Sequence, residues 1–516
     1  MSGSIGYIML AFALYLTGMI IIGAIYAKKN NSSEDYFLGG RSLSGFVAAL
    51  SAQASDMSGW LLMGLPGSVY ALGTGQSWIA IGLFLGTVFN WLVISKRLRR
   101  YTIRANNSLT LPTYFENRFH DKKRILLFVS SVTIVIFFLV YTASALAAGG
   151  KLFSSVFGVE YKIALTIGAF VILVYTFLGG FMAVCVTDFV QGTLMLVAIL
   201  AVPLIALKLI GTGNLSAALE QTNVAGGAVS YLNILDNGGK PFTAVEIISQ
   251  LAWGLGYCGM PHILVRFMAV KDEKELKKSK GIAIGWVALS LFFACVIGVV
   301  GRAYLPGVLE GSESENVFIN MIIKMFTQDF KLPVIGGIFL CGILAAIMST
   351  ADSQLLVSAS SVAEDIFKGI VKKDADNKTV LKVSRITVFV IAILAYFIAL
   401  NPNNSIMGLV SNAWAGLGAA FGPIVLLSLF WKRTNFAGAV AGIVSGALTV
   451  IVWDYIPLVA NGEGVNITLG ASTGLYSLAI GFVIGVVAIV IASLSTKAPT
   501  DEILKEFEDV KNGNIA

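Results

Sequence analysis

The chain has 516 residues, of which 56% are hydrophobic and only 13% are charged, and its mean hydropathy is +0.82. This composition excludes an ordinary soluble domain and indicates an all-α polytopic membrane protein. The net charge of +7 does not favour nucleic-acid binding, because the basic residues are spread over short connections between apolar segments.

A membrane-spanning helix needs about 20 largely apolar residues. The first candidate has no basic region before it and no small-residue cleavage site, so we expect a retained helix rather than a signal peptide. Hydropathy predicts thirteen spans, at residues 5–27, 44–70, 76–95, 125–150, 162–182, 188–210, 242–264, 281–304, 333–361, 380–400, 405–430, 435–457 and 473–494.

Basic residues gather in alternate connections, which predicts that those connections are cytoplasmic. We therefore expect the N-terminus outside and the C-terminus in the cytoplasm. The connections expected inside carry Lys28, Lys29, Arg41, the segments 96–100, 122–124, 271–280, 368–385 and 432–433, and the tail after Lys497. Those expected outside carry only scattered basic residues, such as Lys151, Lys162, Lys240 and Lys331.

The second span carries a carboxylate, Asp56, close to its centre, flanked by Ser55, Ser58 and Gly59. A charged Asp near the bilayer centre is unfavourable by roughly 2.5 to 3.5 kcal/mol, so it should face a cavity, a cation or a partner. The alternative is a carboxylate that only bonds to a neighbouring helix.

Cysteine and histidine residues do not indicate a metal site. Two histidines, His120 and His262, are too far apart in sequence for a convincing cluster. The four cysteines lie in apolar segments without metal-ligand spacing, and we interpret them as packing residues: Cys185, Cys258, Cys295 and Cys341.

The seventh span is interrupted like the second, because it carries Gly254, Gly256, Gly259 and Pro261. Glycine relaxes a helix and proline removes a backbone donor, so both spans are candidates for local unwinding. Counting five spans from each break, the broken span included, gives spans two to six and seven to eleven. Because five is odd, the two halves would have opposite orientations. Such a pair is typical of a transporter with its site between the halves, although glycines also serve ordinary helix packing.

This division predicts an N-terminal extra helix and first cytoplasmic loop (1–43), two inverted repeats (44–210 and 242–430), an external loop (211–241), two additional helices (431–494) and a cytoplasmic tail (495–516). The external loop is rich in Gly and Asn without an apolar period, and we expect irregular or gating structure. We also expect a short helix at the outer surface from Glu315 to Phe326, and one or two helical turns from Asp501 to Val510.

The ninth span places Ala346, Ser349 and Thr350 at i, i+3 and i+4 near its middle, so that one carbonyl and two hydroxyls share a helix face. Neutral oxygen donors suit an alkali cation better than calcium or magnesium. Alternatively, the hydroxyls bond to carbonyls of their own helix.

Four strings resemble the fingerprints of the sodium/solute symporter family: DYFLGGRSLSGF (35–46), SAQASDMSGWLLMGLPG (51–67), GGFMAVCVTDFVQG (179–192) and FWKRTNFAGAVAGIVSG (430–446). The second is similar to the bacterial branch that transports L-proline. The resemblance covers residues 5–494 and implies a LeuT-like fold of thirteen helices, with two broken helices and a five-plus-five inverted repeat, in a bacterial plasma membrane.

The resemblance also implies site residues. Na⁺, as coupling ion, would be bound by the carbonyls of Ala54, Met57 and Ala346 and the hydroxyls of Ser349 and Thr350, with Asp56 and Ser58 at the flank. L-proline or a similar small solute would contact Trp60, Tyr141, Trp253, Tyr257 and Pro261, although any of these aromatic residues could belong to the core instead. Arg41 and Asp188 match functionally sensitive positions near the cytoplasmic ends of their spans, where they could orient loops or form an inner gate.

These observations favour sodium-coupled uptake of a small amino acid, most closely proline. Symport of another small solute remains open. A sensor is less favoured because no soluble domain is expected after Lys497. A membrane enzyme is disfavoured because the sequence shows no nucleophile–base pair and no phosphate loop.

Overall fold

The computed structural model describes residues 2–27, 33–176, 180–222, 224–460 and 465–514, so that Lys28 and Lys29 of the first predicted cytoplasmic loop lie outside the described residues. Ten helical segments in this part are long and apolar enough to cross a membrane. They are α1 (Ser2–Ala27), the run α5, η4 and α6 (Ser77–Phe89, Asn90–Ile94 and Ser95–Arg104), α8 (Ile125–Phe157), α10 (Phe181–Ile210), α15 (Glu273–Tyr304), α17 continued by η9 (Pro333–Ser360 and Ser361–Val371), α18 (Asn377–Ala399), α19 (Ile406–Phe430), α20 (Phe436–Tyr455) and α22 (Ser477–Ser495).

The other three predicted spans are shorter or interrupted. The fifth is α9 (Tyr161–Thr176), the second is divided into α3 (Gly45–Asp56), η2 (Trp60–Gly64) and α4 (Leu65–Leu72), and the seventh into α13 (Ala244–Leu251), η6 (Ala252–Gly259) and α14 (Pro261–Ala269). Each of the thirteen predicted spans therefore corresponds to a helix or a broken helix, although only ten are continuous spanning helices by length and composition.

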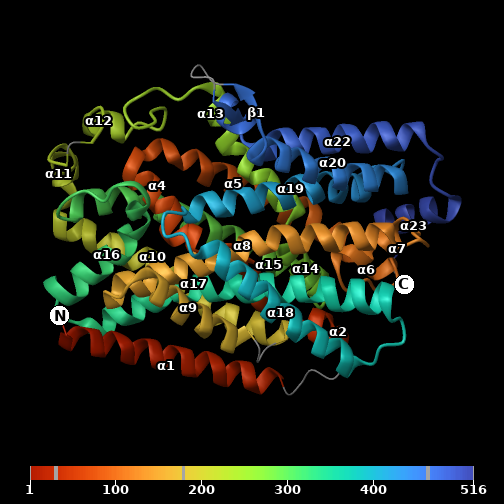
Figure 1. The fold of residues 1–516 in the computed structure, drawn as a ribbon, viewed down its shortest axis with the longest axis horizontal. Coiled ribbons are helices and arrows are strands. Elements are labelled where there is room, and N and C mark those ends of the chain that lie inside the picture. Colours follow the sequence, from red (N-terminus) through yellow and green to blue (C-terminus); the bar gives the residue numbers. More distant parts are fainter. Residues whose placement is uncertain (1, 28–32, 177–179, 223, 461–464, 515–516) are drawn as a thin grey trace.

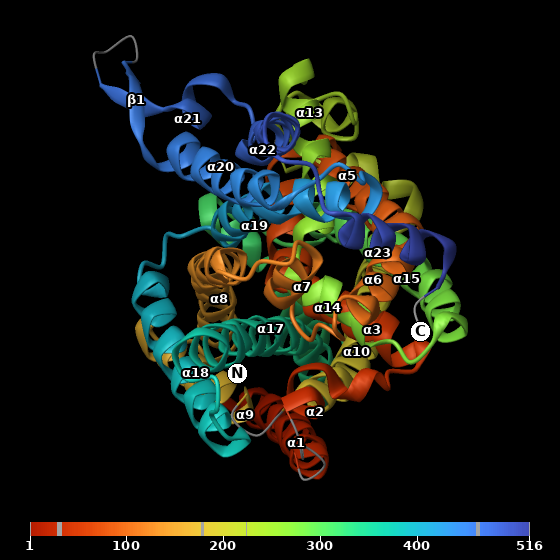
Figure 2. The same ribbon diagram turned by 90° about the vertical axis from the view of Figure 1, so that its right-hand side faces the viewer.

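Most of these helices run along one axis, and the two chain ends lie at opposite ends of it (Figure 1). Helix α1 forms one edge of the bundle, while α20 and α22 pack together at the opposite edge. Viewed along the axis, α3, α10, α14 and α17 gather near the middle (Figure 2). The centre of the bundle therefore contains one part of each broken span, α3 of the first and α14 of the second.

Several predicted boundaries are wrong for local reasons. Helix α10 begins at Phe181 rather than residue 188, directly after Gly180, whose backbone is extended (φ −135°, ψ −176°). Helix α15 begins at Glu273 rather than residue 281, where the Asp272 side chain accepts a bond from the Glu275 amide (2.9 Å). A hydropathy scan misses a polar first turn such as that of α15, whereas the capping residue before it indicates where the helix begins.

Short elements complete the chain: α2 (Ser33–Leu38), η1 (Gly39–Arg41), η3 (Thr74–Gln76), α7 (Leu111–Arg118), η5 (Thr212–Asn214), α11 (Leu215–Glu220), α12 (Gly227–Tyr231), η7 (Gly311–Asn316), α16 (Val317–Ile323), η8 (Lys324–Asp329), α21 (Leu469–Thr473), α23 (Asp501–Asn512) and an antiparallel pair of strands, β1 (Pro457–Ala460) and β2 (Asn466–Thr468).

The segment 211–241 is partly helical and is attached to the first broken span. The Tyr231 hydroxyl donates to the carbonyls of Val69 (2.9 Å) and Tyr70 (3.1 Å) at the end of α4. Gly73 follows with φ +94°, and a Cβ there would lie 2.5 Å from the Tyr231 carbonyl oxygen. Only glycine fits this close approach. The loop is therefore fixed against the outer half of the broken span.

The segment from Glu315 to Phe326 contains the expected short helix, α16, and most of its residues are buried against neighbouring helices. Lys151 Nζ lies 2.6 Å from Glu315 Oε2, and both side chains are less than a tenth exposed. The same carboxylate accepts bonds from the amides of Ile406 and Met407 (3.1 Å each) at the start of α19. Ion pairing and helix capping together stabilise the buried charge.

The tail forms three turns of helix, α23, rather than the one or two expected. Ile503, Phe507 and Val510 form its buried stripe, and it packs on α6. His120 Nε2 lies 3.3 Å from Glu506, and Glu502 completes a group with metal-ligand potential that spacing in the sequence did not indicate.

The two halves approach most closely where glycines meet. A Cβ on Gly254 of η6 would lie 2.1 Å from the Gly82 carbonyl oxygen of α5, and one on Gly86 would lie 2.1 Å from the Gly254 carbonyl oxygen. Backbone therefore packs on backbone beside the second break.

We expect Gly254→Ala to lower the free energy of unfolding by about 1–3 kcal/mol, because the added methyl overpacks this contact. Gly285→Ala on α15 is the matched control, since a Cβ there meets nothing within 4 Å. Thermal unfolding of both purified variants in one detergent provides the measurement. Equal melting temperatures would show that the contact is not tight.

Candidate functional site

The first broken span releases a carbonyl group at its break. Helix α3 ends at Asp56, and the Ser58 amide turns back to the Asp56 carbonyl (3.0 Å). The Trp60 indole donates to the same oxygen (2.9 Å). The Ala54 carbonyl, which would accept from residue 58 in a continuous helix, is thereby available to α17.

Helix α17 meets this carbonyl with the two predicted hydroxyls. Ser349 Oγ lies 2.7 Å and Thr350 Oγ1 3.4 Å from the Ala54 oxygen, and Ser349 Oγ lies 3.3 Å from the Ala346 oxygen. The structure therefore brings Ala54, Ala346, Ser349 and Thr350 together. Met57 lies in the break next to them, buried, with its amide bonded to the Gln53 carbonyl (2.8 Å).

These four residues offer oxygen atoms only, two from carbonyls and two from hydroxyls. In the described structure the hydroxyls donate to the carbonyls, so each oxygen is satisfied by another. If the hydroxyl hydrogens turn away, a small cation of low charge could bind all of these oxygens in their place. The donor set fits an alkali cation and lacks the carboxylates that calcium sites use.

Asp56 joins the two broken spans. Its side chain is fully buried, and Oδ2 accepts a bond from the Tyr257 hydroxyl (2.6 Å) of η6. Among the described residues Oδ1 has no hydrogen-bond partner. A buried carboxylate with one unpaired oxygen is costly, so this oxygen marks a place for a cationic ligand.

Three of the five aromatic and proline residues expected to bind substrate surround this carboxylate. Trp60, Tyr141 and Tyr257 are each at most 1% exposed. Tyr141 of α8 lies near Ser58 and Trp60, and its hydroxyl has no direct hydrogen-bond partner among the described residues. Ser58, the other flanking residue, also accepts from the Trp60 amide (3.3 Å).

Trp253 and Pro261 lie further away. Trp253 stacks on Tyr476 with 5.2 Å between ring centroids. Pro261 begins α14 and lines a narrow cavity together with Phe181 and Arg266. The structure therefore does not place these two in direct contact with Asp56, although both are buried.

Trp414 of α19 is a site residue that sequence reasoning missed. Its indole donates to the Trp253 carbonyl (2.8 Å), and its ring meets Tyr257 edge to face at 5.1 Å. A Cβ on Gly256 would lie 2.0 Å from the Trp414 indole nitrogen. The signal was a single tryptophan among small residues in the eleventh span, opposite a glycine that makes room for it.

Arg266 of α14 is the second missed residue, and it is the partner of Asp188. Its guanidinium lies 3.2 Å from Asp188 Oδ2 of α10, and it donates to Ser51 Oγ of α3 (3.1 Å) and Ser353 Oγ of α17 (2.7 Å). All four side chains are at most 1% exposed. One buried cation therefore links the four central helices, one turn beyond the oxygen cluster on α17.

Arg41 lies apart from this cluster. Its guanidinium donates to the carbonyls of Met268 (2.6 Å) and Ser108 (2.9 Å) and to Asn107 Oδ1 (2.7 Å). Burial lowers the pKa of Arg41 to about 10, so it stays charged at neutral pH. Its contacts are those of a residue that fixes loops to the end of α14.

Comparisons with known proteins agree with this geometry. Residues 36–446 match the sodium:solute symporter family, and the chain belongs to that family. A sodium/proline symporter of Staphylococcus aureus is 43% identical over 501 residues, covering 96% of this chain and 93% of the relative. A sodium/proline symporter of Escherichia coli (strain K12) is 44% identical over 506 residues, covering 97% and 95%.

Solved structures share the fold. A Na⁺-coupled sialic acid symporter, in a substrate-bound outward-open state, superposes with a TM-score of 0.74 at 18% identity, covering 96% of this chain and 99% of that chain. Mhp1, a nucleobase-cation-symport-1 family transporter in a closed conformation, gives 0.52 at 12% identity, covering 93% and 99%. The expected LeuT-like class with broken helices is thereby confirmed.

We expect Asp188→Leu to destabilise the protein by about 3–5 kcal/mol, because the Arg266 guanidinium would remain buried without its carboxylate. The double variant Asp188→Leu with Arg266→Met should recover most of this loss, since no unpaired charge remains. Thermal unfolding of the single and double variants tests this. A single variant as stable as the wild type would contradict the buried pair.

Proposed function

We propose that this protein is a secondary transporter that moves a sodium ion and a small amino acid, L-proline, inward together by alternating access. The observation that carries the proposal is the meeting of the Ala54 carbonyl with Ser349 and Thr350 at the first break, directly beside Asp56. The relatives named sodium/proline symporters, which cover almost the whole chain, support the same pair of transported species.

Sodium is bound by the carbonyls of Ala54, Met57 and Ala346 and the hydroxyls of Ser349 and Thr350. The hydroxyl hydrogens turn away and the ion takes their place between these oxygens, and Asp56, directly beside the site, adds negative charge that attracts it. Because the ligands come from two different helices, binding draws the broken span and α17 together. The ion therefore binds one conformation more tightly than the other, as alternating access requires.

Proline is bound on the other side of Asp56. Trp60, Tyr141 and Tyr257 give the apolar ring its contact area, and the free oxygen of Asp56 accepts from the cationic amine. Trp253 and Pro261 act from the adjoining break, Trp253 through its carbonyl contact with Trp414. The Tyr257–Asp56 bond then links the substrate pocket to the sodium site.

The energy of one sodium ion is sufficient for this work. Entry of one positive charge down a potential of ~100 mV supplies about 2.3 kcal/mol. A tenfold sodium gradient adds about 1.4 kcal/mol. Together they permit accumulation of a zwitterionic solute on the order of several hundredfold.

The repeats comprise residues 44–210 and 242–430, with residues 1–43 before them, the external loop 211–241 between them, and residues 431–494 and the tail 495–516 after them. The N-terminus lies outside and the C-terminus in the cytoplasm of a bacterial plasma membrane. The opposite positions of the two chain ends along the bundle support an odd number of membrane crossings (Figure 1). Arg41 and the Asp188–Arg266 pair stabilise the cytoplasmic closure.

Uptake into proteoliposomes tests the function. With a panel of labelled amino acids, we expect proline to accumulate against its gradient when sodium is imposed outside, and not when lithium or protons replace it. Faster sodium-driven uptake of another solute would replace proline as substrate. Uptake without any sodium dependence would refute symport.

We expect Ser349→Ala and Thr350→Ala each to raise the sodium concentration for half-maximal uptake about tenfold, because one lost ligand worth ~1.4 kcal/mol is a factor of ten. Ser290→Ala on α15 is the matched control, since that buried hydroxyl bonds only to the Val287 carbonyl of its own helix (3.2 Å). Unchanged sodium dependence in both test variants would contradict the hydroxyl site and would place the cation on the Asp56 carboxylate instead.

Orientation is tested by cysteine labelling in intact cells. Lys278→Cys lies in a connection proposed to be cytoplasmic and Lys331→Cys in one proposed to be external, and both side chains are exposed. An impermeant maleimide should label only the second variant. The opposite pattern would invert the topology.

A further inference from the structure

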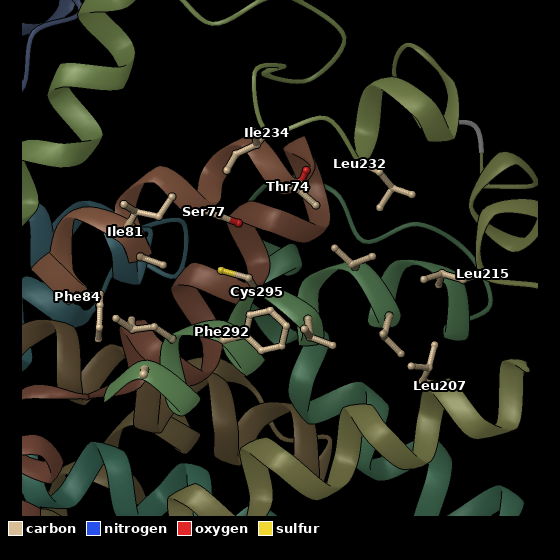
Figure 3. A pocket seen from close by; sticks show the side chains of 16 residues that line it. Thr74, Ser77, Ile81, Phe84, Leu207, Leu215, Leu232, Ile234, Phe292 and Cys295 are labelled. Carbon is tan, nitrogen blue, oxygen red and sulfur yellow. The ribbon is translucent and has the colours of Figure 1, made fainter. Parts of the chain in front are cut away.

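An apolar groove lies between α5, α15 and the external loop (Figure 3). None of the residues expected to bind the cation or the substrate lines it. Its volume is about 660 Å³, within the range of sites for small ligands. Its walls are Ala80 and Phe84 of α5, Ala288 and Phe292 of α15, and Leu232 and Ile234 of the external loop. No residue that lines the groove in the described structure is charged.

The groove opens at the level of the lipid. Helices α5 and α15 belong to segments apolar and long enough to cross a membrane. Phe292, which lines the groove, is 64% exposed, and Leu289 on the same helix is 46% exposed. The groove follows the C-terminal half of α15, where Val296 and Val300 line it, so it lies toward the membrane face of the external loop.

We propose that one acyl chain of a membrane phospholipid, from the leaflet on the side of the external loop, occupies this groove. An apolar space of this size does not hold ordered water, which needs two to four polar partners. An empty space would forfeit the dispersion contacts of every side chain on its walls. A neighbouring lipid tail is the occupant that supplies those contacts.

The groove also has a cation at its rim. Lys208 is exposed in the last turn of α10, next to Leu207, which lines the groove. A lysine at a membrane interface extends its ammonium toward the head groups. A phospholipid phosphate at this level therefore has a counter-charge when its tail lies in the groove.

A lipid tail in the groove would contact the external loop, which is bonded to two helices. The loop wall is fixed to α5 by a bond from the Trp78 indole to the Ile234 carbonyl (3.0 Å). It is fixed to α4 through Tyr231, as described above. The tail thus supports the underside of the loop that is attached to the outer half of the first broken span.

Photo-crosslinking tests the proposal in vesicles of phosphatidylcholine that contain a phosphatidylcholine with a diazirine near the end of one tail. After illumination, mass spectrometry locates adducts. We expect the wild type to be labelled at Leu232 and Ile234 on the loop, because both residues line the groove. Ala288→Trp and Ala80→Phe, which fill the groove from opposite walls, should lower this labelling at least fivefold.

Leu289→Trp is the matched control, because Leu289 is 46% exposed and does not line the groove. Its loop labelling should equal that of the wild type, and labelling around Leu85 should persist in all variants. Size-exclusion profiles identify any variant that fails to fold. If one groove-filling variant fails, the loop labelling of the variant on the other wall tests the proposal. Loop labelling absent from the wild type, or unaffected by groove filling in folded protein, would show ordinary boundary lipid and overturn the proposal.

Discussion

The architecture depends on one constraint: a helix interrupted inside a membrane must find partners for the backbone groups that the break releases. At the first break the Ser58 amide turns back to Asp56, and the Ala54 carbonyl finds the hydroxyls of α17. At the second, the Tyr257 carbonyl accepts from Asn90 Nδ2 (3.0 Å) and the Trp253 carbonyl from Trp414. Side chains from neighbouring helices thus complete the backbone of both breaks, which makes each break sensitive to how those helices are placed.

This arrangement gives a physical route for coupling. The proposed sodium ligands lie on α3, directly after it and on α17. The Asp56 carboxylate beside them is bonded to Tyr257 of the other broken span. A cation that draws the Ala54 carbonyl toward α17 also positions Asp56 and Trp60, whose indole is bonded to the break itself. Further along the same helices, Arg266 holds α3, α10 and α17 together. A change at the sodium site is therefore transmitted to both the substrate pocket and the buried ion pair.

Much of this could be predicted from the sequence because the informative signals are local. Hydropathy located the spans, and Gly, Ser and Pro within two of them located the breaks. An isolated acid, Asp56, and the spacing of Ser349 and Thr350 identified polar groups on apolar helices. The pairing of Ala54 with α17 came from family resemblance, since no local pattern connects residues almost three hundred positions apart.

What sequence reasoning missed depends on tertiary contacts. Arg266 is one charge just beyond the predicted seventh span, and its partner Asp188 is 78 residues away. Trp414 resembles any core aromatic until Gly256 is found opposite it. The apolar stripe of α23 was present in the sequence, but its docking on α6 was not predictable from the tail alone.

The central claim is that sodium at the first break organises the substrate pocket, and binding linkage tests it most directly. Proline affinity of the purified protein should be measured by calorimetry in sodium and in choline, and sodium affinity with and without proline. The account predicts that sodium lowers the proline Kd at least tenfold and that proline lowers the sodium Kd by the same factor, because coupling free energies are reciprocal. A proline Kd that is equal in the two salts would contradict it.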